Sequence, residues 1–285
     1  MRHTGRTYAV TGADSGIGAA TVDLLRRDGA TVIACGTGDH VDVRADLTTR
    51  SGRKALVAAV RRLAPRLHGV ATGAGTGAAT PDGVRLNYFG TVEVLDGLHG
   101  PLAETGGRAV AVTSASALSH GDATIVDSCL SGNEDHAVQA ARIAVDRRRG
   151  GAVYRSTKIA VNRWVRRSAP TWAETGVTIN AVAPGVVDTE TARRTILADP
   201  IAARVVAEAL PQPLGFPGPP EAVAEAISWL LSPTDGFTTG QVVFVDGGAD
   251  ATLRGDEPYA DGVRYGPVAT ARMLWWTVAG RLRRR

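Results

Sequence analysis

Tyr154 and Lys158 are the two residues of this sequence whose types and spacing most clearly suggest chemistry. They lie in a stretch of helical period, 153–172, so the phenol and the ammonium share one face of the expected helix. A phenol with a pKa of about 10 is a poor base at neutral pH, and lowering that pKa by about two units requires roughly 2.7 kcal/mol. A positive charge about 4 Å away contributes roughly 4 kcal/mol at an effective dielectric constant of about 20. The pair therefore predicts a tyrosine that gives and takes a proton.

A glycine-rich segment, 11–18, follows the first strand-like run and precedes a helix-like stretch. Glycines allow a tight turn and let backbone N–H groups approach a phosphate, while the helix directs its positive dipole end at the negative charge. A glycine-rich turn without a ligand is the alternative, but ligands collect beside the first strand of such a parallel sheet. We therefore expect a dinucleotide here, bound by Gly12, Asp14, Ser15, Gly16, Ile17 and Gly18.

The use of lysine at position 158 supports the chemical interpretation. An isolated Tyr-x-x-x-Lys pattern is usually an amphipathic helix with a solvated lysine, but Lys54 and Lys158 are the only lysines among 32 basic residues. Arginine would supply the charge, yet it cannot give up a proton and its planar fork fits less easily under a ribose. We therefore expect Lys158 to take part in the chemistry.

The elements that must hold these residues alternate along the first 250 positions. Short apolar runs, typical of strands buried on both faces, occur at 8–11, 31–35, 69–72, 109–113, 177–182 and 242–245. Stretches of helical period lie between them, at 17–27, 51–63, 83–103, 153–172 and 221–231. The order predicts an α/β fold with one doubly wound parallel sheet of Rossmann type. We expect one domain over 1–248, with an insert at about 119–150, and a C-terminal extension over 249–285.

Composition restricts the class of protein. The chain has 285 residues, 44% hydrophobic and 21% charged, as expected for one globular domain, and no apolar run long enough to span a membrane. Its N-terminus leaves no room for a signal peptide, so we expect a cytoplasmic protein. With only Cys35 and Cys129, neither a structural disulfide nor a metal site is expected. The net charge is +4, but five arginines lie in the last fourteen residues, so no basic surface for nucleic acid is predicted.

The glycine loop and the tyrosine–lysine pair together resemble the short-chain dehydrogenase/reductase family, and the resemblance covers residues 7–248. It implies that Asn87 positions a proton-relay water. It also implies that Ser114 holds the substrate oxygen, with Ser116 as the alternative. The segment 180–189 resembles the one that binds the nicotinamide carboxamide, through Pro184, Gly185, Val187 and Thr189.

Within the family, the chain is most similar to the 3α-hydroxysteroid dehydrogenase/carbonyl reductase subgroup. Ser114 and Tyr154 lie forty positions apart, much farther than in most members, and that subgroup carries a similarly long insert. The segments 45–47, 52–54 and 87–90 also resemble its sequence. A shared scaffold does not fix the substrate.

The sequence indicates the choice between NAD and NADP less directly than it indicates the dinucleotide site. NAD-linked members usually place an acid at the end of the second strand, whereas NADP-linked members place a cation there or before the second loop glycine. Asp39 is expected to reach the ribose and no cation is placed for a 2′-phosphate, so NAD is favoured and NADP is the alternative. Asp46 and Leu47 are expected beside the adenine, unless Asp46 is a helix cap. The backbone of Gly73, Ala74 and Gly75 should lie close to the cofactor.

The insert and the extension bear on assembly. The insert leaves the chain between Ser114 and Tyr154, so we expect it to block the dimer that family members form on the Tyr154 helix. A homodimer or homotetramer would then use another face. The insert segment 133–145 has helical period with a cap at Ser131 or Asn133, and its His120 and His136 are expected to be solvated.

In the extension, an apolar stripe of helical spacing precedes the terminal arginines: Val268, Ala271, Trp275, Val278 and Leu282. Docking on a subunit and lying on an anionic membrane surface are the two interpretations. The short apolar face favours docking.

These features predict reversible hydride transfer between a nicotinamide and a carbonyl or secondary alcohol carbon of a small molecule. Asn87, Ser114, Tyr154 and Lys158 would be catalytic, with no metal. The segment at about 190–220 is the expected substrate lid, and its apolar residues suggest an apolar cyclic or aromatic ketone, unless they form a packed helix: Ile196, Ile201, Val205, Val206, Leu214 and Phe216. Imine reduction, epimerisation and a non-catalytic dinucleotide-binding regulator are the alternatives, although a complete tetrad argues against the last.

Overall fold

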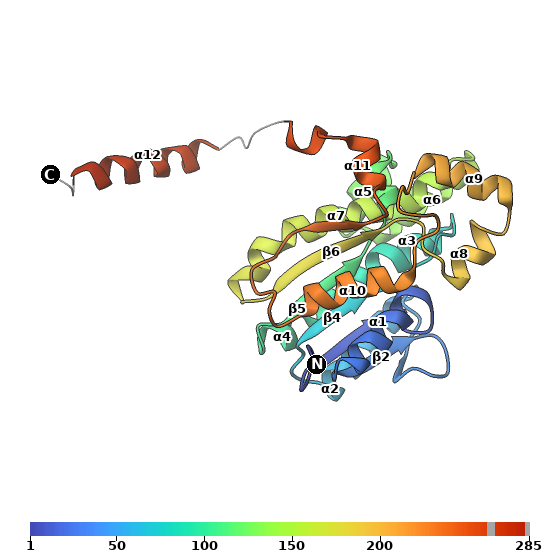
Figure 1. Ribbon diagram of the computed structural model, residues 1–285, viewed down its shortest axis with the longest axis horizontal. Helices are drawn as coiled ribbons and strands as arrows, with labels where there is room; N and C mark the ends of the chain where they lie inside the picture. The colour runs from blue at the N-terminus through green and yellow to red at the C-terminus, as the bar shows by residue number, and fades with distance from the viewer. Residues whose placement is uncertain (261–265, 283–285) are drawn as a thin grey trace. The chain divides into compact units, whose positions relative to one another are not determined.

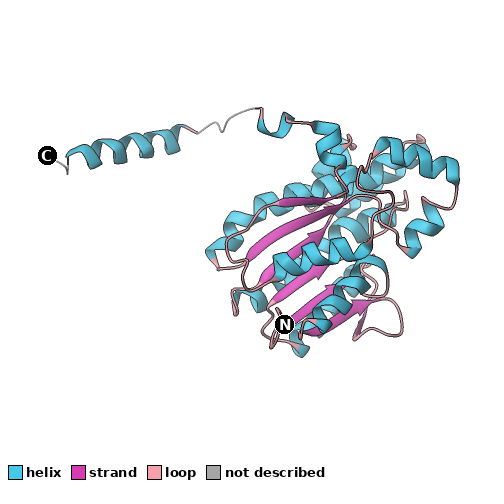
Figure 2. Cartoon of the chain, in the orientation of Figure 1, coloured by secondary structure: helices cyan, strands magenta, loops and turns pink. Residues whose placement is uncertain are grey.

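A seven-stranded parallel sheet forms the centre of the computed structural model, which describes residues 1–260 and 266–282. The chain divides into two compact units, Met1–Asp250 and Ala251–Arg285, which are described separately. The strands of the first unit are β1 (Thr7–Thr11), β2 (Thr31–Gly36), β3 (Val43–Arg44), β4 (Gly69–Thr72), β5 (Arg108–Val112), β6 (Thr178–Pro184) and β7 (Val242–Val245). Their spatial order is β3-β2-β1-β4-β5-β6-β7, and every neighbouring pair is parallel (Figure 2). The predicted doubly wound fold is confirmed.

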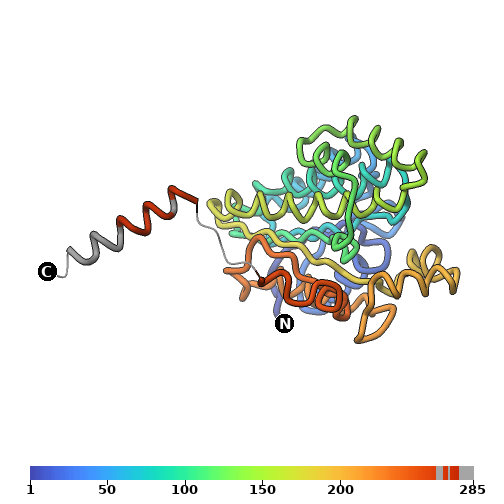
Figure 3. The backbone as a smooth tube through the Cα atoms, turned by 90° about the horizontal axis from the view of Figure 1, so that it is seen from above, coloured from blue at the N-terminus to red at the C-terminus, as the bar shows by residue number. Residues whose placement is uncertain are grey.

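Helices cover both faces of this sheet (Figure 3). On one face, α1 (Gly16–Arg27) packs against α10 (Pro220–Leu231), and Leu25 and Ile227 join the core formed with the strands. The other face is covered by α2 (Arg50–Leu63), α4 (Gly90–Ala103) and α7 (Gly151–Glu174). Because the central strands β1, β4, β5 and β6 are buried on both faces, they are continuous apolar runs rather than alternating ones.

The strand order reverses between β1 and its two neighbours, β2 and β4. The connection after β1 leads to α1 on one face, whereas the connections after β3 and β4 lead to α2 and α4 on the other face. A crevice therefore opens at the carboxyl ends of these strands, which is where ligands bind in doubly wound sheets. The glycine loop follows β1 directly, so the fold places it in that crevice.

The segment expected as one helix over 83–103 is divided into three parts. A short α3 (Pro81–Val84) leads into a π-helical turn, Arg85–Phe89, which continues as α4. π-Helical turns inside α-helices occur frequently at functional sites, because the extra residue reorients side chains and frees a backbone group. Asn87 lies in this turn.

The insert consists of two helices, α5 (Ala123–Leu130) and α6 (Glu134–Asp146). The helix expected over 133–145 is confirmed, and its cap is Asn133, whose Oδ1 accepts a hydrogen bond from the His136 N–H at 3.1 Å. The first helix was not predicted, because eight residues are too few to show a clear period. Ile125 and Ala141 are fully buried in the core beside α7, so the insert is part of the packed domain.

A buried ion-pair cluster ties the insert to the rest of the domain. The Arg53 side chain on α2 is only 1% exposed, and it donates to Glu134 on α6 at 2.7 Å and to Glu93 on α4 at 2.8 Å. Arg50 adds a second donor to Glu134 at 2.8 Å. A buried charge remains favourable only when its partners are held in place, so this cluster fixes α6 against α2 and α4.

Two short helices follow β6, namely α8 (Glu190–Thr195) and α9 (Pro200–Ala209). The chain continues from α10 and β7 into α11 (Ala249–Arg254), which crosses the division between the two units. The second unit holds a 3₁₀ turn, Glu257–Tyr259, and α12 (Pro267–Leu282) (Figure 1). Of the expected apolar stripe, Val268 and Trp275 are exposed, whereas the side chains of Val278 and Leu282 lie outside the described residues. Among the helices described, none has the length and apolar character needed to span a bilayer.

Candidate active site

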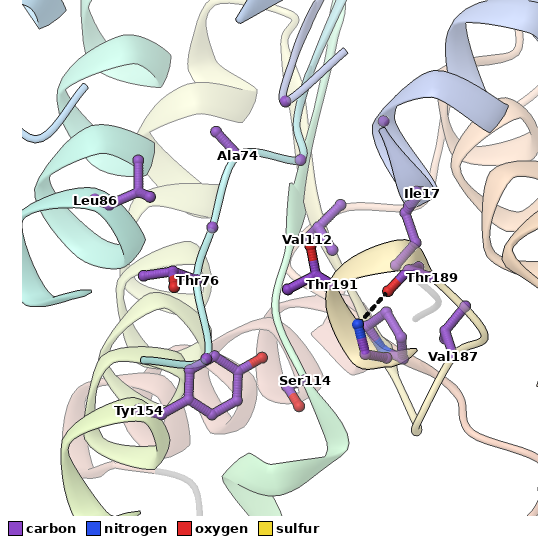
Figure 4. A pocket seen from close by; sticks show the side chains of 18 of the residues that line it. Ile17, Ala74, Thr76, Leu86, Val112, Ser114, Tyr154, Val187, Thr189 and Thr191 are labelled. Carbon is purple, nitrogen blue, oxygen red and sulfur yellow. Dashed lines mark hydrogen bonds between the residues drawn. The ribbon is translucent and has the colours of Figure 1, made fainter. Parts of the chain in front are cut away.

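A cavity of about 820 Å³ lies at the carboxyl edge of the sheet (Figure 4). It is lined by the loops that follow β1 to β6 and by residues of α7, α8 and α9. The lining includes every residue predicted to bind the cofactor except Asp39: Gly12, Asp14, Ser15, Gly16, Ile17, Gly18, Asp46, Leu47, Gly73, Ala74, Gly75, Pro184, Gly185, Val187 and Thr189. Segments far apart in the sequence therefore converge on one cavity.

The glycine loop has the shape needed to hold a pyrophosphate. Gly12 and Gly16 have φ of +68° and +54°, conformations that other residues adopt with strain. A Cβ on Gly12 would lie 2.6 Å from the Ala74 nitrogen, so the loops after β1 and β4 approach each other only because this residue is glycine. Ser15 precedes α1 but makes no side-chain capping bond, which leaves the first N–H groups of α1 available to an anion. We call this loop, residues 11–18 with the start of α1, the cradle, and its shape fits a dinucleotide.

Three of the four predicted catalytic residues meet at the other end of the cavity. Tyr154 and Lys158 project from one face of α7, and the Lys158 Nζ lies 5.6 Å from the centre of the Tyr154 ring. The Lys158 Nζ also donates to the Val112 carbonyl at 3.0 Å, which holds the ammonium at the end of β5. Ser114 follows β5, and the Tyr154 hydroxyl points toward its side chain (Figure 4). Two hydroxyl groups and one ammonium thus lie together beside the cradle.

Burial governs the proton affinities of this cluster. Loss of solvent lowers the pKa of Lys158 from 10.5 to about 8, because the charged ammonium is disfavoured away from water. Burial also raises the pKa of Tyr154, although its hydrogen bond with Ser114 acts in the opposite direction. The sequence-based expectation that Lys158 brings the pKa of the phenol below its usual value is therefore not met in the protein chain by itself. Desolvation of the phenolate outweighs the hydrogen bond with Ser114.

Asn87 supports the site without lining the cavity. Its side chain is fully buried, and it binds the backbone of Thr76 twice, accepting from the N–H and donating to the carbonyl, each at 2.9 Å. Gly75 lies between this amide and Lys158, since a Cβ there would be 3.2 Å from Asn87 Oδ1 and 3.6 Å from Lys158 Nζ. Asn87 therefore fixes the loop after β4 against the lysine.

Both serines proposed for the substrate oxygen line the cavity. The Ser114 Oγ accepts a hydrogen bond from the Ser116 N–H at 3.1 Å and interacts with Tyr154. The Ser116 Oγ is buried and has no partner among the described residues. Ser114 is the better placed of the two for proton exchange, because only its hydroxyl interacts with the phenol.

Asp39 lies outside the cavity. Its carboxylate pairs with Arg44 at 2.8 Å and is 82% exposed, so the structure does not bring it to the expected ribose position. Arg44, its partner, belongs to β3, a strand of two residues that is too short to predict from the sequence. Asp46 does line the cavity, but its Oδ1 accepts from the N–H and hydroxyl of Thr48 at 2.9 and 2.7 Å. The cap of α2 is Thr49.

Asp14 takes the place at the end of β2 that Asp39 was expected to fill. Its two carboxylate oxygens accept hydrogen bonds from the N–H groups of Thr37 and Gly38, each at 2.9 Å. A Cβ on Gly36 would lie 2.0 Å from Asp14 Oδ2, and one on Gly38 would lie 2.6 Å from Oδ1. Gly36 at the end of β2 and Gly38 after it therefore admit a carboxylate that comes from the loop after β1.

The substrate end differs in part from the predicted lid. Ile196 and Val206 line the cavity, together with Thr191, Thr195 and Leu210, which were not singled out. The other four apolar lid residues were wrongly assigned, since Ile201, Val205, Leu214 and Phe216 are absent from the lining. The first three are 76%, 63% and 91% exposed, so they form neither a pocket wall nor a packed helix face.

Arg155 is a cavity residue that the sequence analysis did not identify. The signal for it was present, because Gly151, Tyr154, Arg155 and Lys158 follow the three-and-four spacing of one helical face. Its Nε donates to the His120 carbonyl at 3.0 Å, which ties α7 to the beginning of the insert.

Comparisons with known proteins agree with this geometry. A family model described as enoyl-(acyl carrier protein) reductase matches residues 133–250. A 3-alpha-hydroxysteroid dehydrogenase/carbonyl reductase from Comamonas testosteroni is 31% identical, over 86% of this chain and 96% of its own length. A cis-4-hydroxycyclohexanecarboxylate dehydrogenase from Sinomonas cyclohexanicum is 32% identical, over 86% of this chain and 97% of its own length.

Among solved structures, a 3-alpha-hydroxysteroid dehydrogenase from Pseudomonas sp. B-0831 in complex with NADH is 40% identical. It matches with a TM-score of 0.80, over 87% of this chain and 98% of that one. Sequence identity at this level across nearly whole chains, a shared fold and the assembled tyrosine–lysine site lead to one conclusion. The chain belongs to the short-chain dehydrogenase/reductase family and is an NAD(P)-dependent oxidoreductase that acts on a small molecule.

Proposed function

We propose that this enzyme interconverts a ketone and a secondary alcohol on an apolar ring system, with NAD(H) as its cofactor. The observation that carries the proposal is the convergence of the Tyr154 and Ser114 hydroxyls beside the Lys158 ammonium at one end of a glycine cradle. When bound, the nicotinamide supplies a hydride to the carbonyl carbon or accepts one from the alcohol carbon. The chain itself must bind the substrate oxygen and move its proton.

The site residues divide this work. Ser114 donates a hydrogen bond to the substrate oxygen, and Tyr154 gives that oxygen a proton during reduction. The raised pKa of Tyr154 suits this direction, because the phenol carries its proton at neutral pH. In oxidation, the Lys158 ammonium stabilises the phenolate as Tyr154 takes the proton back, and it also binds the ribose hydroxyls. Asn87 positions the Thr76 loop, and we propose that it supports the proton relay to solvent from there.

An apolar substrate is supported by the apolar residues in the cavity lining, including Leu86, Ile196, Val206 and Leu210. The similar proteins that act on 3α-hydroxysteroids point to the same class. A screen of cyclic and aromatic ketones, followed by the loss of NADH absorbance, tests the proposal. We expect turnover with several cyclic ketones, and binding of NADH without turnover of any ketone would instead indicate a dinucleotide-binding regulator.

The preference for NAD is supported by the charges at the adenosine end of the cavity. Among the described residues that line this end, Asp14 and Asp46 carry the charge, and those from the end of β2 include no cation. The 2′-phosphate of NADP would meet the Asp14 carboxylate, whereas the ribose hydroxyls of NAD would donate hydrogen bonds to it. The similar enzyme that was solved with NADH agrees with this preference.

Replacing Asp14 with asparagine should therefore reverse part of the preference. Asparagine keeps one acceptor for the loop but removes the negative charge, so we expect NADH to bind about tenfold more weakly and NADPH more tightly, as loss of a charged hydrogen bond predicts. Dissociation constants from fluorescence titration measure both effects without turnover. Asp39→Asn is the matched control and should change neither constant. If the ratio of the NADH and NADPH dissociation constants changes in Asp39→Asn and not in Asp14→Asn, the sequence-based assignment of Asp39 to the ribose is restored.

We further propose that the enzyme is a homodimer or homotetramer that avoids α7 as its interface. Helix α5 of the insert packs along α7, so the insert occupies part of the surface that such a dimer would need. Docking of the C-terminal extension on a subunit, rather than on a membrane, belongs to the same proposal. A cytoplasmic location fits the two buried free cysteines, Cys35 and Cys129.

A further inference from the structure

We propose that Arg155 recognises a carboxylate on the substrate, so that the preferred substrate is a cyclic keto or hydroxy acid. The inference rests on the proposed oxidoreductase function and specifies its substrate class. It begins with the distribution of charge in the cavity, whose charged lining residues are Asp14, Asp46, Lys158 and Arg155. The two acids lie at the adenosine end, and the two cations lie together on α7 at the catalytic end.

Lys158 is already engaged at this end of the cavity. Its ammonium donates to the Val112 carbonyl and lies beside the Tyr154 ring. Arg155 therefore supplies the second positive charge, which the proton chemistry does not use. No carboxylate lines the catalytic end to neutralise it.

The guanidinium of Arg155 is oriented but not neutralised. Its Nε donates to the His120 carbonyl at 3.0 Å, which fixes the plane of the group. Within residues 1–260 and 266–282, no carboxylate forms an ion pair with it and no hydrogen-bond acceptor is assigned to its terminal nitrogens. By contrast, Arg149 and Arg163, which flank it in sequence, pair with Asp122 and Asp127 at 3.7 and 3.6 Å.

The terminal nitrogens of the Arg155 guanidinium lie where a substrate can reach them. Arg155 and Gly151 both line the cavity, and a Cβ on Gly151 would lie only 3.6 Å from the Arg155 Nη1. Glycine at 151 therefore leaves open the space beside the terminal nitrogens. A guanidinium held at Nε presents its remaining N–H groups as a planar fork, which matches the two oxygens of a carboxylate.

The anion is that of the substrate rather than of the cofactor. The pyrophosphate cradle lies at the start of α1, whereas Arg155 lies on α7 beside Tyr154. Arg155 follows Tyr154 directly in the sequence and contacts the loop after β5 that also contributes Ser114 and Ser119. The substrate would thus place its carbonyl between Tyr154 and Ser114 and its carboxylate toward the insert.

The test compares several cyclic keto acids with their methyl esters, using Arg155→Ala, Arg155→Lys and wild-type enzyme. We expect wild type to prefer the acids, and Arg155→Ala to lower kcat/KM for each acid by about tenfold or more while the ester changes little, as loss of a charged bidentate bond predicts. The kcat/KM of Arg155→Lys for each acid should lie between the values of wild type and Arg155→Ala. Arg163→Ala removes an arginine of the same helix outside the cavity and should leave the acid-to-ester ratio unchanged.

A purely structural role of Arg155 in holding the insert would lower activity on acid and ester alike, and that result overturns the proposal. A higher kcat/KM of the wild-type enzyme for the methyl esters than for the acids overturns the proposal as well. Calorimetric binding of a cyclic carboxylic acid to the enzyme–NADH complex gives a readout without turnover, and it should weaken in Arg155→Ala. If no ketone of either kind is reduced although NADH binds, the proposed function itself fails, and the substrate class fails with it.

Discussion

Tyr154→Phe should lower kcat by about two to four orders of magnitude, because proton transfer by a positioned side chain contributes about that much. Phenylalanine keeps the ring and its packing on α7 but removes the hydroxyl that, in the proposed mechanism, gives a proton to the substrate oxygen. The affinity for NADH should stay nearly unchanged, since the cradle lies in the loops after β1 and β4. Steady-state kinetics and fluorescence titration of NADH separate the two effects.

Two results would contradict this prediction. Activity near that of wild type would show that Tyr154 is not the proton donor, and a parallel loss of NADH binding would show that the ring is needed for the shape of the cavity. Tyr259→Phe is a matched control, because Tyr259 is exposed and belongs to the second unit of the chain. It should behave as wild type.

Lys158→Met should also lower kcat and, in addition, change how the free energy of unfolding depends on pH. Methionine has a similar length but no charge, so the phenolate loses its nearest positive group and kcat should fall by at least about a hundredfold. The lowered pKa of Lys158, about 8 instead of 10.5, corresponds to roughly 3 kcal/mol of desolvation cost in the folded state. A buried charge required for chemistry is thus a source of instability.

The sign of the pH effect follows from proton binding. Below pH 8, Lys158 is charged in both states, and the folded protein bears the full cost of burying it. Between pH 8 and 10.5, the unfolded chain binds the additional proton, so the unfolding free energy of wild type rises with pH. Lys158→Met lacks this rise, and its unfolding free energy relative to wild type should fall by up to about 3 kcal/mol over that interval.

Denaturant unfolding at several pH values from 7 to 10.5 measures this difference. The other lysine of the chain, Lys54, is exposed and provides the control, because Lys54→Met should follow the wild-type pH dependence. A constant difference between Lys158→Met and wild type across the interval would mean that Lys158 is not desolvated. The prediction concerns the slope and holds whatever the fixed cost of leaving the Val112 carbonyl without its donor.

The sequence by itself determined the fold and the elements that carry the site. Strands buried on both faces appear as continuous apolar runs, and helices packed on one face repeat every three to four residues, so both signals are local. The glycine loop and the Tyr154–Lys158 pair are local for the same reason, since each depends on spacings within a single turn or helix. The elements that escaped prediction are short ones, among them β3, α5, α8, α9 and the π-helical turn around Asn87.

The tertiary structure alone decided which side chains meet across separate elements. The sequence predicts Asp14 in the glycine loop and Asp39 at the ribose, whereas in the structure Asp14 accepts a hydrogen bond from Thr37 in the turn after β2 and Asp39 pairs with Arg44. Similarly, the raised pKa of Tyr154 results from burial by several segments, which no spacing within α7 encodes. The orientation of Arg155 depends on a carbonyl thirty-five positions away. Local sequence sets backbone conformation, whereas solvation and contacts between distant segments arise only when the chain packs.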